Sequence, residues 1–351
     1  MNNKIYINAR FLTQKLTGVQ RFAYEISKNL SVILKDRIVL IVPKSSKILS
    51  CYKRDFIIKR VGVNKGHIWE QIDLFIFLKN KKNPLLLNLT NSGPILYSNQ
   101  VSTVHDISFY FNKDWYPLMY RILYKFITPR LIEKSFKIIT VSEFSKKIIA
   151  EHFNINKNKL IVINNAVSLR IKQQKIDSLS EKYLLFVGAS SKRKNLKNVL
   201  KAFSEISLKG LKIKIVGLGS SYNQNNKLFN NKNIEILNNI NDEMLINLYS
   251  NAQMLIFPSF YEGFGIPPLE AMNFNCPVIA SDIPVFREIY KDAALYVDPS
   301  SINEIKNAIL ELFNNENLRL KQVKLGLIQS QKYSWKKSAD KLIKSLQLIN
   351  E

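Results

Sequence analysis

The chain has 351 residues, of which 46% are hydrophobic and 23% charged, and its formal net charge is +25. This length suits two domains of ordinary size, and because no run of about 18 apolar residues occurs, we expect no membrane-spanning helix. The N-terminus lacks the apolar core and cleavage site of a secretory signal, so we expect a cytoplasmic protein. Cys51 and Cys276 have no metal-ligand spacing, which fits two thiols in a reducing compartment.

The positive charge is concentrated in the first half. Residues 1–170 carry 28 Lys and Arg against 10 Asp and Glu, a balance of +18, whereas residues 171–351 carry 24 against 17, a balance of +7. A+T-rich coding, which favours Lys and Asn, explains part of the excess. The difference in charge between the two halves is the feature that coding bias explains least well. It leaves open an anionic partner such as nucleic acid, a membrane surface or a polyanionic ligand.

Short apolar runs alternate with amphipathic segments along the first half. Helical patterns cover 18–30 and 142–153, and Ser142 or Ser145 can cap the second of them. We expect strands at 4–8, 37–42, 85–89, 101–105, 137–141 and 160–163.

The second half repeats this rhythm, with the polar stretch 168–182 as the link and helical patterns beyond about residue 301. Continuous apolar strands that alternate with helices favour parallel sheets covered on both faces. We therefore predict an α/β protein of two doubly wound, Rossmann-like domains, with a ligand at the carboxyl ends of the strands, in a central cleft. The expected strands are 183–188, 211–217, 234–237, 254–258, 277–281 and 294–298.

The stretch SFYEGFGIPPLEAM (259–272) follows one of these buried strands and carries the strongest chemical signal. Pro267 and Pro268 fit the first turn of a helix, where a missing N–H costs nothing. Gly263 and Gly265 allow the backbone to approach a ligand closely and to present its N–H groups. The stretch therefore predicts a ligand-binding loop that leads into a helix.

The loop amides and the positive end of the helix form an expected anion site at Phe264, Gly265 and Ile266. Glu262 lies on the loop, and we expect Glu270 in the first helical turn. Acids beside an anion site bind something other than the anion, and sugar hydroxyls are the natural guests. Glu270 taken alone is also explained as an acid favoured by the helix dipole.

YEGFGIPPLEAM resembles the E-x7-E signature of the retaining glycosyltransferases of family 4, which have the GT-B fold. The resemblance covers nearly the full length. It extends to TGVQRFAYEI, VHDISF and VSEFSKKII in the first half, and to VGASSKRKNLKNVLKAF, PVIASDIPVFREI, DAALYVDP and YSWKKSADKL in the second. It implies an acceptor-side domain at 1–170, a donor-binding domain at 171–330 and a closing helix at 331–351.

The resemblance also implies a nucleotide-sugar donor and a role for each matching residue. Glu262 would contact the hydroxyls of the donor sugar and Glu270 those of the ribose. His105, which is followed by Asp106, would touch the donor sugar from the other domain. Gly18 would lie where the first domain meets the donor phosphates, although an ordinary helix-entry glycine is the alternative.

The basic turn GASSKRKN (188–195) supplies cations for the donor diphosphate. Lys194 matches the lysine of the family. The arginine that many members carry just after the glycine is replaced by Ala189, so Arg193 is expected to serve instead, because a guanidinium suits bidentate phosphate contact. A solvated basic turn is the alternative reading of this segment.

No D-x-D motif occurs in the sequence, so we expect no metal and no other cofactor. The overall pattern looks most like mannosyltransferases of O-antigen or capsule assembly, which favours GDP-mannose and leaves UDP-sugars open. The resemblance implies a lipid-linked glycan as acceptor, at the inner face of the cytoplasmic membrane. The basic and aromatic segment 114–134 could lie against anionic lipid or pack its apolar face in the core.

Four other functions compete with this one. A nucleotide-sugar epimerase or a phosphorylase shares the fold, but epimerases lack the E-x7-E loop and phosphorylases are larger and need a lysine-bound pyridoxal cofactor. A dehydrogenase is the next alternative, because VGLGSSY (216–222) starts like a dinucleotide-binding fingerprint, but the third glycine of that fingerprint is missing. A nucleic-acid-binding protein would fit the charge, yet the chain has no recognition signature for one.

Overall fold

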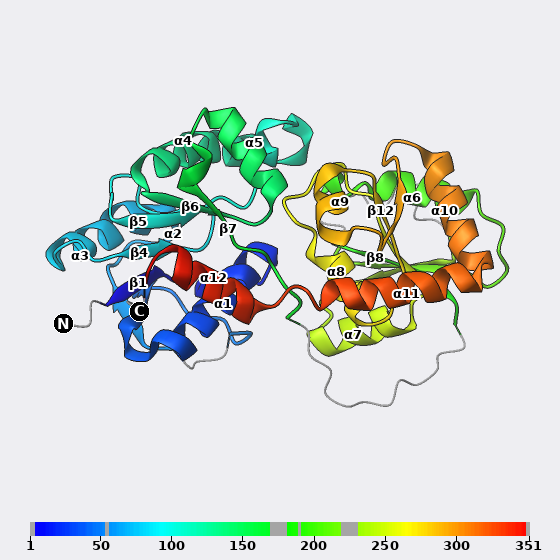
Figure 1. The fold of residues 1–351 in the computed structure, drawn as a ribbon, viewed down its shortest axis with the longest axis horizontal. Helices are drawn as coiled ribbons and strands as arrows, with labels where there is room; N and C mark the ends of the chain where they lie inside the picture. Colours follow the sequence, from blue (N-terminus) through cyan, green and yellow to red (C-terminus); the bar gives the residue numbers. More distant parts are fainter. Residues whose placement is uncertain (1–3, 53–55, 169–180, 189–190, 219–230, 349–351) are drawn as a thin grey trace. The chain divides into compact units, whose positions relative to one another are not determined.

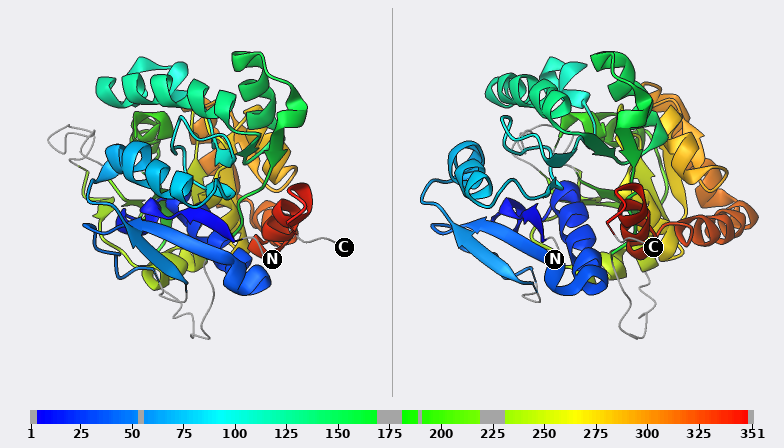
Figure 2. Two further views of the ribbon diagram at one scale, coloured as in Figure 1. Left: turned by 90° about the vertical axis from the view of Figure 1, so that its left-hand side faces the viewer. Right: turned by 60° about the vertical axis from the view of Figure 1, so that its left-hand side comes forward.

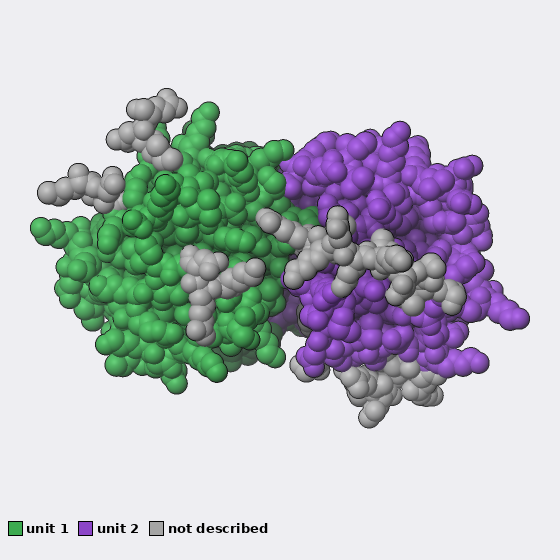
Figure 3. Space-filling model, turned by 90° about the horizontal axis from the view of Figure 1, so that it is seen from below, with its two compact units in different colours: residues 1–113, 117–168, 334–351 green, residues 114–116, 169–333 purple. Residues whose placement is uncertain are grey.

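The computed structural model describes residues 4–52, 56–168, 181–188, 191–218 and 231–348. The chain divides into two compact units (Figure 3). The first comprises Met1–Lys113, Pro117–Ser168 and Ser334–Glu351, and the second comprises Asp114–Tyr116 and Leu169–Tyr333. The expected link at 168–182 lies for the most part outside the described residues, as do residues 219–222 of VGLGSSY.

The first unit is built on a parallel sheet in the order β3-β2-β1-β4-β5-β6-β7. All the predicted strands of this half are present, and β3 is an additional edge strand. Its residues Lys59 and Arg60 are exposed, so it lacks the apolar run that marks the others. The strands are β1 (Ile5–Asn8), β2 (Ile38–Pro43), β3 (Ile58–Val61), β4 (Leu86–Asn88), β5 (Gln100–Thr103), β6 (Lys137–Thr140) and β7 (Leu160–Val162).

Helices cover both faces of this sheet (Figures 1 and 2). Ser142 caps α5, because its side chain accepts a hydrogen bond from the N–H of Ser145. Helix α12 packs on α1, and the Trp335 indole donates to the Ser168 hydroxyl at 2.8 Å. The helices are α1 (Gly18–Leu34), α2 (Gly66–Trp69), α3 (Phe75–Asn80), α4 (Leu118–Lys134), α5 (Glu143–Phe153) and α12 (Trp335–Ser345).

Shorter helical turns connect these elements. A π-helical segment, η3 (Glu70–Leu74), joins α2 to α3 without a break. The 3-10 turns of the first unit are η1 (Arg10–Thr13), η2 (Lys35–Arg37), η4 (Ser108–Tyr110) and η6 (Lys157–Lys159); η5 (Lys113–Trp115) lies where the units divide, and η7 (Lys192–Lys194) belongs to the second unit.

The second unit has a parallel sheet in the order β10-β9-β8-β11-β12-β13. All the strands predicted for this half are present, and their apolar runs form a core with α6 and α10 on one face. The strands are β8 (Tyr183–Val187), β9 (Lys212–Val216), β10 (Ile234–Leu237), β11 (Met254–Phe257), β12 (Val278–Ser281) and β13 (Leu295–Val297).

Helix α8 packs against α11 and α7, and α10 packs against α6. The helices of this unit are α6 (Leu196–Ser204), α7 (Asp242–Asn251), α8 (Ile266–Asn273), α9 (Pro284–Tyr290), α10 (Ile302–Asn314) and α11 (Glu316–Ser330). Across the described part of the chain, no helix combines the length and apolarity that crossing a bilayer requires.

The predicted α/β fold of two doubly wound domains is confirmed. In each sheet the strand order reverses once, between β1 and β4 in the first unit and between β8 and β11 in the second. Loops that leave the carboxyl ends of such strand pairs diverge to opposite faces and open a crevice, which is where open α/β sheets bind ligands. The loops after β8 and β11 contain the predicted site of the second unit.

Candidate functional site

Backbone and side-chain hydrogen bonds tie the loop after β8 to the loop after β11. The N–H of Phe260 donates to the carbonyl of Arg193 at 3.0 Å, and the Arg193 guanidinium donates to the carbonyl of Tyr261. Asn195 adopts a left-handed conformation (φ 64°), and its side-chain amide donates to the carbonyl of Pro258 at 3.0 Å. The two loops therefore form one framework at the switch point.

Glu262 lies in this framework with both predicted cations. Arg193 Nη1 is 2.9 Å and Lys194 Nζ 2.6 Å from Glu262 Oε1, and the three side chains are 8–14% exposed. Burial alone would raise the pKa of Glu262, but the two cations and their hydrogen bonds outweigh it and lower this pKa to about 2. Glu262 is therefore an anion near neutral pH.

Lys194 has a second neighbour, because its ammonium lies 4.4 Å from the centre of the Phe257 ring at the end of β11. Ser191 accepts a hydrogen bond from the N–H of Arg193 and so fixes the turn η7 that carries both cations. Ala189, which stands where many family members have an arginine, lies outside the described residues.

The loop ends at Gly265, which caps α8 in a left-handed conformation (φ 89°). The buried hydroxyl of Tyr290 donates to the carbonyl of Gly265 at 2.7 Å, and a Cβ at position 265 would lie 2.0 Å from that hydroxyl. Pro267 and Pro268 lie at the start of α8, as the sequence predicts. Only a glycine fits the cap, because residues with a side chain rarely adopt this positive φ and no space is left for a Cβ.

The expectation that Glu270 lies in the first turn of the helix is wrong. Helix α8 begins at Ile266, so Glu270 is its fifth residue, and the first turn contains no acid. Its carboxylate is buried, and Tyr249 on α7 donates a hydrogen bond to Glu270 Oε2 at 3.1 Å. Tyr249 also stacks on Phe274, which follows α8. Glu262 and Glu270 therefore have different partners: two cations contact Glu262, and a tyrosine hydroxyl donates to Glu270.

Tyr249 is a site residue that the sequence reasoning did not single out. It lies 21 positions before Glu270, on another helix, and only the packing of α7 on α8 brings the two together. The remaining loop residues, Gly263 and Phe264, are buried, and the Phe264 ring packs edge-on against Tyr333. Ile266 opens α8 and is partly exposed.

His105 and Gly18 belong to the first unit. His105 follows β5, and its backbone N–H donates to the side-chain oxygen of Asn91 at 2.9 Å. The ring of His105 packs edge-on against Phe22 of α1. Burial lowers the pKa of His105 to about 4, although the carbonyl of Leu89 and the charge of Asp106 oppose the shift. The imidazole is therefore neutral near pH 7.

Gly18 is the first residue of α1, after Thr17 at the cap position. It thus occupies the helix-entry position that the sequence indicates. Its contact with donor phosphates stays a prediction, as does the contact of His105 with the donor sugar.

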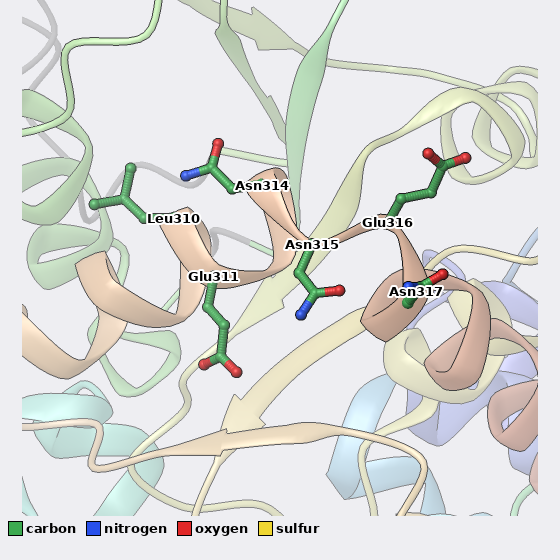
Figure 4. A pocket seen from close by; sticks show the side chains of 6 residues that line it. All are labelled: Leu310, Glu311, Asn314, Asn315, Glu316 and Asn317. Atoms are coloured by element: carbon green, nitrogen blue, oxygen red, sulfur yellow. The ribbon is translucent and has the colours of Figure 1, made fainter.

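One pocket lies at the turn between α10 and α11, and none of the residues that line it is a predicted site residue (Figure 4). Its lining residues are Leu310, Glu311, Asn314, Asn315, Glu316 and Asn317. Within the described ranges, no group of three or more His, Cys, Asp or Glu side chains is placed to hold a metal ion.

The arrangement in the second unit combines two cations, a charged carboxylate and a helix start. The cations can hold an anionic group such as a phosphate, with bidentate geometry available to Arg193. The carboxylates of Glu262 and Glu270 can accept hydrogen bonds from hydroxyl groups. Together they suit a ligand that carries both phosphate and hydroxyl groups.

Two family models together span nearly the whole chain. Residues 16–170 match the model described as Glycosyltransferase Family 4, and residues 168–327 match the one described as Glycosyl transferases group 1. The O-antigen chain mannosyltransferase RfbU of Salmonella typhimurium is 33% identical over 245 residues, which is 69% of this chain and 67% of the relative. The O-antigen chain mannosyltransferase B of Escherichia coli is 28% identical over 73% of this chain and 74% of its own length.

Solved glycosyltransferases have the same fold along the whole chain. WaaG, a glycosyltransferase involved in lipopolysaccharide biosynthesis, superposes with a TM-score of 0.75 at 14% identity, over 99% of this chain and 100% of its own. Anabaena HepE, solved in complex with UDP and glucose, gives 0.74 at 14% identity over the same shares. At such identities, the likeness shows the fold alone.

Proposed function

Because this chain belongs to glycosyltransferase family 4 and has its GT-B fold, we propose that it transfers a hexose from a nucleoside-diphosphate sugar to a glycan acceptor linked to a membrane lipid, with retention of configuration. GDP-mannose is the favoured donor, and O-antigen or capsule assembly is the favoured context. The support for mannose is the likeness to two O-antigen mannosyltransferases. A UDP-sugar is the alternative donor, since HepE was solved with UDP and glucose.

The observation that carries the proposal is the ion cluster of Arg193, Lys194 and Glu262. Transfer breaks the bond between the anomeric carbon and the diphosphate, so negative charge develops on the departing oxygen. Two cations fixed at a switch point stabilise such charge without reorganisation. We assign them the role that a metal ion has in other transferases, and so propose a metal-independent reaction.

Glu262 has a double role in this scheme. Without donor it neutralises the two cations, and with donor its carboxylate accepts hydrogen bonds from hydroxyls of the transferred sugar. The amides of Phe264, Gly265 and Ile266 contribute to the same anion site at the start of α8. Glu270 accepts hydrogen bonds from the ribose hydroxyls, and the neutral imidazole of His105 contributes a hydrogen bond to the donor sugar.

Peripheral binding to an anionic membrane is the second part of the proposal. The first half of α4 exposes apolar side chains at helical spacing, among them Leu118, Ile122 and Phe126, and Met119 is 75% exposed. Arg121 and Lys125 lie on the same helix, which combines apolar contact with attraction to anionic headgroups. Only the second half of α4 buries a row of residues in the core.

Incubation of labelled GDP-mannose or UDP-glucose with a bacterial lipid extract tests the transfer. We expect sugar to enter the lipid phase with wild-type protein, and Glu262→Ala to abolish this transfer without unfolding the chain. Near-normal turnover in a folded Glu262→Ala protein would contradict the role of Glu262. An epimerase would alter the nucleotide sugar itself, and a nucleic-acid-binding protein would do neither.

Liposome flotation tests the membrane part. We expect binding to require anionic lipid and to weaken in high salt. The double substitution Met119→Ser and Ile122→Ser should reduce this binding. Salt-independent binding to neutral liposomes would contradict it.

A further inference from the structure

A buried charged network in the first unit has no role in the scheme above. Glu70, the first residue of η3, is fully buried, and its Oε1 accepts hydrogen bonds from Asn8 (2.9 Å), Arg10 (3.0 Å) and Ser92 (2.9 Å). Its Oε2 lies 2.9 Å from Nδ1 of His67. We call these five residues the Glu70 network.

The Glu70 network lies at the switch point of the first sheet. Asn8 is the last residue of β1, Asn88 is the last residue of β4, and the side chains of these two residues are hydrogen-bonded at 3.1 Å. Arg10 follows β1 and Ser92 follows β4. In the second unit, Arg193 and Lys194 likewise follow β8, and Glu262 follows β11, so cations meet a glutamate at the equivalent place in both sheets.

Stabilisation of the core does not by itself explain why this network of charged residues is buried. Burial would raise the pKa of Glu70, but Arg10 and His67 lower it, so the carboxylate is charged. A buried ion pair gains little over well-packed apolar residues, because removing both charges from water is costly. Glu70 also begins a π-helical segment, a feature that is frequent at functional sites.

His67 is the most exposed member of the network. Its side chain is 28% exposed, whereas that of Glu70 is fully buried. Its ring packs edge-on against Tyr124 of α4, with 5.9 Å between centres, and Tyr124 packs in turn on Tyr120 at 4.4 Å. Partly exposed aromatic rings beside oriented polar groups suit a sugar, which has apolar C–H faces and hydroxyl edges.

We infer that His67 binds a hydroxyl group of the acceptor glycan, with Glu70 as the residue that positions its ring and Tyr124 beside it as an apolar wall. An ionised carboxylate can only accept, so Nδ1–H of His67 donates to Glu70. Nε2, the other ring nitrogen, is then left to form a hydrogen bond with the acceptor hydroxyl. The inference rests on the proposed glycosyl transfer and assigns its acceptor side.

The test compares His67→Ala and His67→Asn with the wild-type chain. An Asn side-chain amide can replace Nδ1–H toward Glu70 but has no atom at the place of Nε2. His152→Ala is the control, because His152 is an exposed histidine of the same unit that packs against Tyr110. The assays are hydrolysis of GDP-mannose or UDP-glucose without acceptor, and transfer to methyl α-glycosides of mannose, galactose, glucose and rhamnose.

We expect both His67 variants to raise KM for the glycoside by about tenfold, the effect of one lost hydrogen bond. Donor hydrolysis and the Kd of the nucleoside diphosphate should stay unchanged, and His152→Ala should behave as wild type. Recovery of the wild-type KM in His67→Asn would overturn the inference, because a purely structural contact with Glu70 would then suffice. An unchanged KM in His67→Ala, or no transfer by the wild type to any glycoside, would overturn it too. Failure of the wild type to turn over either donor would instead contradict the proposed function.

Discussion

Replacing Glu262 by Gln removes one negative charge between two cations, and the structure sets the size and the pH dependence of the effect. The folded chain lowers the pKa of Glu262 from 4.5 to about 2, against the cost of burial and through Arg193 and Lys194. A shift of roughly 2.5 units corresponds to about 3 kcal/mol. The side chain is only 8% exposed, so solvent screening reduces this little.

The sign of the pH dependence follows from the direction of the shift. The folded pKa is below the unfolded one, so the stabilisation is present above about pH 4.5 and is lost as the pH falls toward 2. We therefore expect Glu262→Gln to lower the free energy of unfolding by about 3 kcal/mol at pH 7 and by roughly half as much at pH 3. Urea unfolding at several pH values, followed by circular dichroism, measures both quantities.

Glu181→Gln is the matched control. Glu181 also lies between two lysines, Lys212 and Lys214, and its pKa is also lowered to about 2, but its side chain is 30% exposed. Exposed ion pairs contribute under about 1 kcal/mol, so we expect a much smaller effect. Equal losses in the two variants, or a loss for Glu262→Gln that persists at pH 2, would refute the reasoning.

Three further predictions concern the same chain. Tyr249→Phe should weaken binding of GDP or UDP by about three- to tenfold, since Glu270 loses one hydrogen bond, and calorimetric titration should show no such loss for a 2′,3′-dideoxy analogue; equal losses would contradict the ribose role. Gly265→Ala should lower the free energy of unfolding by about 3 kcal/mol, because the new Cβ clashes with a buried tyrosine hydroxyl. Gly210→Ala, at a similar positive φ but in open space, should lower it by about 1 kcal/mol. Similar losses for the two variants on urea unfolding would show that the clash is relieved. Because burial lowers the pKa of His105 from 6.5 to about 4, its contribution to stability is present above pH 6.5 and falls away toward pH 4; His105→Gln should flatten the pH dependence of unfolding in that window, and an unaltered profile would speak against a buried neutral ring.

The sheets could be predicted from the sequence because their central strands are buried on both faces and appear as continuous apolar runs. The exception is β3, an edge strand whose Lys59 and Arg60 face solvent, so no apolar run marks it. The family could also be predicted, because the loop that begins at Glu262 and the helix after it form one local pattern. The family models and RfbU confirm that assignment.

The side-chain contacts within the site were not predicted, because they join residues that are distant in the sequence. Glu262 and Arg193 are 69 positions apart, and only the adjacency of β8 and β11 brings them together. The hydrogen bond from Tyr249 depends in the same way on the packing of α7 against α8. The position of Glu270 was wrong by part of a turn, because the helix begins at Ile266, one residue before the first proline.

A crystal structure of the chain with GDP or UDP would test the central claim most directly. The account predicts the diphosphate at Arg193 and Lys194 and the ribose hydroxyls within hydrogen-bond distance of Glu270. A diphosphate bound elsewhere, or a nucleotide that leaves Glu270 bonded only within the protein, would contradict it.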